Sequence, residues 1–211
     1  MPRSKDFDPT NAVDDSLEVF WRHGYNGTSM EQLVAATRLS RSSIYSEFGS
    51  KRGLFDRALE RYLEIFIATL QPLREGGIES IISFLGDLKG SVFLDPEFGC
   101  LVVNVRSEFP ANDSSFRRLH VRYARSIESG FESALATADL LGELAESTDL
   151  RLRVSHLSLM LLGLFVYARG NPNADATAKR VEALVAEVES WRRRSFRQRR
   201  GRSRPSRDLS R

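Results

Sequence analysis

The sequence predicts an all-α protein with about nine helices, and three observations lead to this prediction. Apolar residues recur three and four positions apart over most of the chain, which is the spacing of one helical face. No segment alternates β-branched and polar residues between turn signals, as a half-buried strand would. Gly24 and Pro72 stand where they would end helices.

The first fifty residues contain three short helical stretches separated by tight turns. The first stretch ends at Gly24, a residue that readily forms the left-handed cap of a helix. The second begins with a capping-box pattern, in which the Thr28 hydroxyl would accept from the Glu31 amide. The third begins at Ser40 as its N-cap. The inner faces of these stretches are marked by apolar residues: Val13, Leu17, Phe20, Met30, Leu33, Val34, Ile44 and Phe48.

A longer helix is predicted from Ser50 to Leu70, with a stop at Pro72. Its length would allow it to join two units. Further helices are expected at residues 78–88, 99–109, 113–138, 150–170 and 174–191. The helix at 150–170 is apolar over much of its surface, so we expect this helix and the last one to bury a surface against a partner.

The net charge of +3 conceals an uneven distribution of charged residues. Residues 191–211 hold ten Arg and one Asp, or +9, which leaves 21 Lys and Arg against 27 Asp and Glu, or −6, in the rest of the chain. The first 55 residues carry seven basic and seven acidic side chains, so charge alone does not argue for DNA binding there. The Arg-rich tail, residues 192–211, has little hydrophobic content and is expected to be disordered.

The compartment is inferred from three features of the sequence. A single cysteine, Cys100, cannot form an intramolecular disulfide, and the first ten residues lack the apolar stretch of a signal peptide. The longest apolar run, residues 157–168, is shorter than the roughly 20 residues that span a bilayer. We therefore expect a cytoplasmic protein with no membrane partner.

Residues 20–55 resemble the DNA-binding domain of TetR-family transcriptional regulators. The resemblance rests on a spaced set of residues and not on one short motif: Phe20, Gly24, Tyr25, Thr28, Ser29, Leu33, Ala36, Leu39, Ser40, Tyr45, Phe48, Ser50, Lys51 and Leu54. Residues 99–104 and 161–188 are similar to one C-terminal subgroup of the family. The resemblance implies a three-helix helix-turn-helix DNA-binding domain at residues 1–50, a helical ligand-binding and dimerisation domain at 51–191, and the tail at 192–211.

Short polar residues cover the side of the third helix away from its core face, where a helix-turn-helix protein reads the major groove. Arg41 is the best candidate for a guanine contact. Family analogy adds Tyr45 and Lys51 as phosphate contacts, and Thr28 with Ser29 at the start of the second helix. Capping is an equally simple role for Thr28 and Ser40, and a core position is the alternative for Tyr45. The expected DNA-binding residues are Thr28, Ser29, Ser40, Arg41, Ser42, Ser43, Tyr45, Ser46 and Lys51.

Three positions depart from the family pattern. Arg38 stands where the turn commonly has Gly, and because a Cβ disfavours positive φ, this residue puts a tight glycine-like turn in doubt. Ser42 stands where the recognition helix often has Gly. Glu47 stands where an aromatic is frequent, and it would repel phosphate if it pointed at DNA.

Sensor residues are harder to predict, because aromatic side chains can line a pocket or simply fill the core. Cys100, Tyr123, Met160 and Phe165 are the expected ligand or sensor residues. Cys100 would lie at a helix start, where free amides and the helix dipole favour a thiolate, and its segment resembles a position that senses electrophiles or oxidants in some relatives. The alternative role of Cys100 is that of a small buried hydrophobe. No metal or cofactor is expected, since the cysteine and the histidines lack the close spacing of metal ligands.

The predicted function is that of a transcriptional repressor that binds a double-stranded DNA operator as a homodimer. An unknown small-molecule effector, or modification of Cys100, would release it by shifting the helix at 50–70, and it would be nucleoid-associated while bound. An enzyme is disfavoured because the HExxH and GxSxG motifs and a phosphate-binding Gly loop are all missing from the sequence. The alternative is a helical nucleic-acid-binding protein that acts mainly through its Arg-rich tail.

Overall fold

A computed structural model describes residues 8–145, 149–171 and 173–193, and these residues form nine α-helices and no strand. The helices are α1 Pro9–His23, α2 Met30–Thr37, α3 Arg41–Phe48, α4 Lys51–Thr69, α5 Gly77–Asp87, α6 Leu101–Asn104, α7 Ser114–Leu140, α8 Leu150–Ala168 and α9 Ala174–Ser190. The all-α prediction and the expected number of helices are confirmed. The Arg-rich tail lies outside the described residues from position 194 onward.

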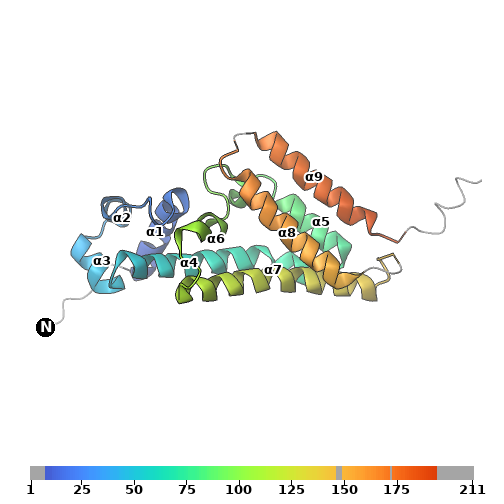
Figure 1. The fold of residues 1–211 in the computed structure, drawn as a ribbon, viewed down its shortest axis with the longest axis horizontal. Helices are drawn as coiled ribbons and strands as arrows, with labels where there is room; N and C mark the ends of the chain where they lie inside the picture. The colour runs from blue at the N-terminus through green and yellow to red at the C-terminus, as the bar shows by residue number, and fades with distance from the viewer. Residues whose placement is uncertain (1–7, 146–148, 172, 194–211) are drawn as a thin grey trace, which may run out of the picture.

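The helices form an elongated molecule with α1, α2 and α3 at one end (Figure 1). α4 and α7 both begin near that end and run side by side along the molecule. Beyond them, α5 packs against α7 and α9, and α8 packs against α7 and α9. α4 is therefore the helix that leads from the first three helices into the larger part of the structure.

Most helix starts are fixed by a side chain that accepts a hydrogen bond from a free backbone amide. Ser40 caps α3 and Ser50 caps α4, each accepting from the amide three residues later, as the sequence predicts. Gly24 caps the end of α1 as predicted, but its φ of 72° and ψ of −176° lie outside the left-handed helical region that a left-handed cap would have. Four orphan amides lie at each helix start, so these caps set where the short helices begin.

The capping box of α2 was predicted one residue too early. Ser29 is the N-cap: its hydroxyl accepts from the Gln32 amide, and its own amide donates to the Gln32 side chain. Thr28 is 2% exposed, and its hydroxyl donates to the Gly24 carbonyl at 2.6 Å. Thr28 thus stabilises the turn after α1 and not the start of α2. The capping-box pattern, Ser or Thr followed three residues later by Glu or Gln, fits Thr28 with Glu31 and also Ser29 with Gln32. The pattern alone therefore could not decide which residue is the cap.

The turn between α2 and α3 has a left-handed residue even though that residue is Arg38. Its φ is 56° and its ψ is 17°, so the doubt raised by the missing glycine was wrong. For a residue with a Cβ this conformation costs about 1 to 2 kcal/mol. Leu33 before the turn and Ile44 after it are both fully buried, and their burial offsets that cost.

The helix predicted at residues 99–109 is shorter and interrupted. α6 has only four residues, and a 3-10 turn follows at Arg106–Glu108. Gly99 has a positive φ of 58°, and the Asn104 side chain donates to the Phe98 carbonyl at 2.6 Å. These contacts bend the chain back on itself, so the segment cannot continue as one helix.

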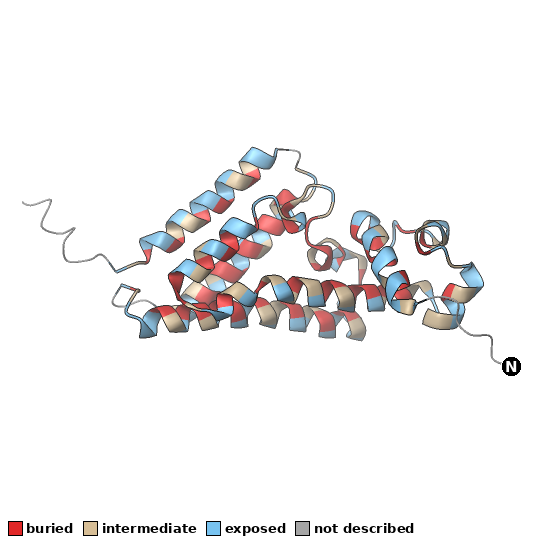
Figure 2. Cartoon of the chain, turned by 180° about the vertical axis from the view of Figure 1, so that it is seen from behind, coloured by how far each residue is buried: buried red, intermediate tan, exposed pale blue. Residues whose placement is uncertain are grey.

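One continuous cluster of buried side chains runs from α1 to α9. In α1, Phe20 packs on Phe55 of α4 with ring centroids 5.0 Å apart, and Trp21 packs on Tyr62 at 4.9 Å. Figure 2 shows the buried residues along the facing sides of the packed helices. The predicted boundary after residue 50 is not marked by a break in this cluster and stays a prediction.

α8 leaves one of its faces without a partner in the single chain. Within the described ranges it is the one helix that is long and apolar enough, by length and composition alone, to cross a membrane. Its inner face packs on α7 and α9, as the core helix of a folded protein does. Leu152, Leu159 and Val166, spaced seven residues apart, are exposed on the other face.

Candidate DNA-binding surface and buried polar centre

The outer face of α3 is polar and open to solvent. Ile44 is fully buried and fastens the opposite face of α3 to the core. Arg41, Ser42, Tyr45 and Ser46 are exposed, whereas Ser43 is half-buried. Tyr45 has 45% of its surface exposed, which excludes the alternative that it is a core aromatic. The predicted recognition residues of α3 thus share one surface that can approach a DNA groove.

Arg41 has a partner that the sequence analysis missed. Its guanidinium donates to the carboxylate of Glu31 in the first turn of α2. The Glu31 carboxylate accepts hydrogen bonds from the backbone at the start of α2 and from the Ser29 side chain, and these bonds lower its pKa. The charge of Arg41 lowers this pKa further. An exposed ion pair contributes only about 0 to 1 kcal/mol. A DNA base can therefore replace Glu31 as the partner of Arg41 at little cost.

The remaining predicted DNA contacts lie in different surroundings. Thr28 is buried and its hydroxyl is already bonded, so it is not part of the exposed surface. Ser29 and Ser40 are exposed N-caps. Lys51 is half-buried with its ammonium 4.5 Å from the centre of the Tyr25 ring, and burial lowers its pKa. Lys51 thus packs against the α1–α2 turn and does not extend freely into solvent.

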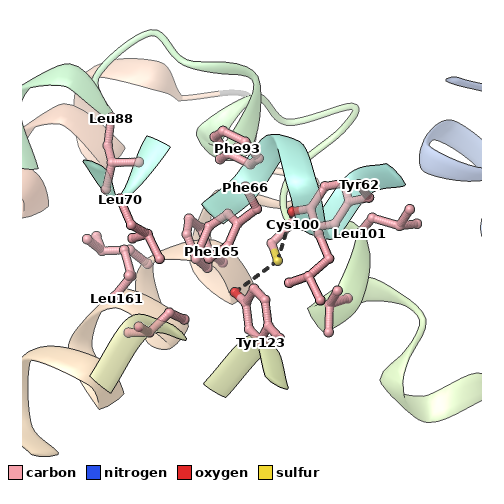
Figure 3. Close-up of a cluster of buried hydrophobic side chains, with 14 of the residues drawn as sticks. Tyr62, Phe66, Leu70, Leu88, Phe93, Cys100, Leu101, Tyr123, Leu161 and Phe165 are labelled. Carbon is pink, nitrogen blue, oxygen red and sulfur yellow. Dashed lines mark hydrogen bonds between the residues drawn. The ribbon is translucent and has the colours of Figure 1, made fainter. Parts of the chain in front are cut away.

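Three buried polar groups meet in the core between α4, α6 and α7. The Cys100 sulfur lies 3.1 Å from the Tyr62 hydroxyl and 3.1 Å from the Tyr123 hydroxyl (Figure 3). Cys100 is 0% exposed, and burial raises the pKa of its thiol. The predicted thiolate at a helix start is therefore not favoured, because desolvation outweighs the amides of a four-residue helix.

The four predicted sensor residues do not all come together. Tyr123 and Phe165 are both buried, and each ring packs against Phe66, at 4.8 and 6.0 Å. Met160 is 41% exposed on α8 and does not join the group around Cys100. The sequence missed Tyr62, because a contact between residues 38 positions apart leaves no signal in local spacing.

The comparisons with known proteins agree with this geometry. The profile described as "Bacterial regulatory proteins, tetR family" matches residues 12–58, the region from α1 into α4. Two curated regulators align over most of the chain. YezE of Bacillus subtilis (strain 168), an uncharacterized HTH-type transcriptional regulator, is 28% identical over 194 residues, which cover 90% of this chain and 100% of that protein. This chain belongs to the TetR family.

Two further transcriptional regulators are similar to this TetR-family chain over most of its length. The HTH-type transcriptional repressor ComR of Escherichia coli (strain K12) is 29% identical over 173 residues, covering 79% of this chain and 82% of ComR. A solved structure of the TetR-family regulator CifR, a cysteine mutant complexed with 26-bp operator DNA, superposes with a TM-score of 0.73. It is 27% identical and covers 89% of this chain and 98% of CifR. The chain is thus a DNA-binding transcriptional regulator.

In this TetR-family chain the start of α4 is tied to the start of α7. Arg52 donates to both carboxylate oxygens of Asp113 at 2.7 and 2.9 Å, and also to Asp56 at 2.8 Å. The hydrogen bonds from Arg52 hold the pKa of Asp113 at about 2. Glu108 accepts from the Asn26 amide at 2.6 Å in the α1–α2 turn. These contacts fasten the helix-turn-helix end to the rest of the regulator.

An open cleft of about 240 Å³ lies between the end of α4 and the middle of α7. Its lining residues are Ile67, Leu70, Arg74, Ser126, Ser129, Gly130 and Ser133. None of the four predicted sensor residues lines it. Within the described ranges no three His, Cys, Asp or Glu side chains are grouped to hold a metal ion.

Proposed function

We propose that this regulator is a homodimeric repressor that binds a pseudo-palindromic operator and leaves it when a small molecule binds the helical region 51–191. The exposed polar face of α3, with Arg41, Ser42, Tyr45 and Ser46, carries the proposal. One recognition helix of eight residues contacts too few base pairs for specificity in a genome, and a two-fold axis doubles the site. The names of two relatives, the repressor ComR and the negative regulator IcaR of Staphylococcus aureus, support repression.

Four of the predicted DNA contacts have distinct roles in this proposal. Arg41 exchanges Glu31 for the acceptor edge of a guanine, and Tyr45 reaches a phosphate with its hydroxyl. The amides at the starts of α2 and α4 hold further phosphates, beside Ser29 and Lys51. Thr28 is excluded from this set because its hydroxyl is committed to the Gly24 carbonyl.

The exposed face of α8 is the proposed dimer surface. Leu152, Leu159 and Val166 lie in line on it, and burying them against a second copy removes an exposed apolar stripe from water. The exposed Gly163 has nothing within 4 Å of where a Cβ would stand, so two α8 helices can approach closely there. α8 and α9 then pair with their symmetry mates as a four-helix bundle.

Of the two release mechanisms that the sequence suggested, non-covalent ligand binding has the stronger support. A thiol with raised pKa and no exposed surface is a poor nucleophile in the ligand-free protein. We expect Cys100 to react with a thiol reagent at least about a hundredfold more slowly in the native protein than in denaturant, since reaction requires local opening. Stopped-flow or spectrophotometric thiol titration measures both rates.

A companion measurement tests whether Cys100 takes part in release. Operator release by a non-covalent inducer should be the same for the wild type and for Cys100→Ser, which keeps a small side chain between the two tyrosines. Rapid labelling of the native thiol, together with a serine variant that no longer responds to electrophiles, would instead establish release by cysteine modification.

The proposed function is tested by selecting bound fragments from a pool of random DNA duplexes. The expected product is an inverted repeat bound by two protomers. A chain shortened after Arg193 should enrich the same repeat, since the tail contributes only salt-sensitive, sequence-independent affinity.

Calorimetry tests the coupling between operator and inducer, with an inducer identified by its release of the protein from that operator. Operator should weaken inducer binding by the same factor by which inducer weakens operator binding. Enrichment of no sequence, or inducer affinity unaffected by operator, would contradict the proposal.

A further inference from the structure

Arg169, the residue that follows α8, contacts the helix-turn-helix end of the molecule directly. We propose that Arg169 is a positioning residue for operator binding: it connects α8 to α1 through residues 95–99, here called the bridging loop, and so fixes the angle of the DNA-binding head, α1 to α3. This connection is separate from α4. The inference rests on the proposed function, in which α8 forms the dimer surface.

The guanidinium of Arg169 joins three main-chain carbonyls from two parts of the chain. One nitrogen, Nη1, donates to the carbonyls of Glu97 and Phe98, the latter at 2.8 Å. The other, Nη2, donates to the Arg22 carbonyl at 3.0 Å. The Arg22 carbonyl belongs to the last turn of α1, where carbonyls have no partner within the helix. Arg169 therefore caps the end of α1 from the end of α8.

The bridging loop is itself bound to α1 by a second set of contacts. The indole nitrogen of Trp21 donates to the Gly99 carbonyl at 2.7 Å in a buried position. Arg22 pairs with the Glu97 carboxylate at 2.5 Å and places its guanidinium 4.3 Å from the centre of the Phe98 ring. The loop thus touches consecutive residues at the end of α1 with polar, ionic and aromatic contacts.

The loop is also held in shape and attached to the end of α8. The Gly170 amide donates to the Pro96 carbonyl at 2.9 Å, next to the contacts of Arg169. Inside the loop, the Asp95 carboxylate accepts from the amides of Glu97 and Phe98. A loop closed by its own hydrogen bonds transmits a displacement of α8 to α1, whereas a loose loop would absorb it.

The angle of the head depends on how many separate points hold it. α4 holds the end of α3, Glu108 holds the α1–α2 turn through the Asn26 amide, and the Arg169 contacts hold a further point at the end of α1, on the side of α8. In a dimer joined through α8, that angle sets the distance and rotation between the two α3 helices. Arg169 therefore determines which spacing between operator half-sites the dimer accepts.

The experiment compares operator affinities at three half-site spacings: the selected operator, and the same sequence with one base pair inserted or removed at its centre. One base pair rotates one half-site relative to the other by about 35°. The wild type should strongly prefer the selected spacing. Arg169→Gln should bind the selected operator roughly tenfold more weakly, the effect of losing charge-assisted hydrogen bonds, and should lose most of the preference for spacing.

Matched variants separate this role from simple stabilisation and from loss of charge. Arg118→Gln removes one positive charge from an exposed residue of α7 that makes no ion pair within the described part of the chain, and it should keep the wild-type preference. Arg169→Lys, which can still donate to the carbonyls, should restore part of it. Trp21→Phe removes the hydrogen bond to the Gly99 carbonyl and so weakens the same connection from the side of α1. It should lose the spacing preference as Arg169→Gln does, and it tests the proposal independently if Arg169→Gln fails to fold.

Two results would overturn the inference. If Arg169→Gln and Trp21→Phe weaken all three operators by the same factor, these residues only stabilise the fold. If the wild type shows no preference among spacings, the two-headed dimer of the proposed function fails together with the role of Arg169. A spacing preference that the variants leave unchanged overturns only the role of Arg169, and the homodimeric repressor stands.

Discussion

Replacing Leu159 by Glu is expected to produce a folded monomer that no longer binds the full operator tightly. Leu159 is 65% exposed in the single chain and lies in the apolar stripe of α8, between Leu152 and Val166. In the single chain the new carboxylate stays in water, so the fold should persist. In the dimer two carboxylates would lose water without a partner, at several kcal/mol each. The dimer dissociation constant should therefore rise by a factor of roughly 1,000 or more.

Sedimentation velocity measures the oligomeric state, circular dichroism the fold, and titration with labelled duplex the operator affinity. Operator affinity should fall at least about a hundredfold, because a single head makes half of the specific contacts. The matched control is Leu141→Glu: Leu141 is 66% exposed but follows α7 and is not part of the α8 stripe. A Leu159→Glu protein that sediments as a dimer would show that the interface lies elsewhere.

Arg41→Ala is expected to weaken operator binding by roughly 1 to 3 kcal/mol, or about five- to 150-fold, the contribution of a two-bond contact between arginine and guanine. The fold should be unaffected, since Arg41 is exposed and its pair with Glu31 is weak. The variant should also lose its preference for one base pair in each half-site. This loss of preference separates a base contact from a phosphate contact, which would weaken all sequences alike.

The measurement is a set of operator titrations in which each base pair of the half-site is changed in turn. Arg57→Ala is the control for charge, because Arg57 is exposed on α4 and has no ion pair among the residues that the structure describes. It should leave the base preferences intact. If Arg41→Ala lowers affinity equally for every sequence, Arg41 contacts only the DNA backbone.

The long helices were predicted well because one face of each is buried continuously. The stripe of α7 from Phe116 through Tyr123 to Phe131 is buried throughout, as its helical spacing indicates. The segment after Gly99 was predicted poorly, because its shape depends on partners far away in the sequence. Trp21 bonds to the Gly99 carbonyl from a position 78 residues earlier. No local pattern carries that information.

The same distinction separates the predicted from the missed site residues. The exposed face of α3 follows from the burial of Ile44 on the opposite face, so the sequence alone locates it. The partners of Arg41 and Cys100, which are Glu31 and Tyr62, lie on other helices, and only the packing of those helices brings them close. At Arg38, tertiary packing on both sides of the turn overrode the local preference against positive φ.

A chimeric regulator made by joining a foreign head at residue 50 would inherit half of each aromatic pair that crosses the junction. Phe20 would be separated from Phe55, and Trp21 from both Tyr62 and Phe98. The foreign head would then present its own side chains to surfaces shaped for these rings, leaving voids or clashes in the core. DNA specificity in this scaffold is exchanged cleanly only when the partner rings travel with the head: Phe55 and Tyr62 of α4, and Phe93, Phe98 and Phe109 beyond it.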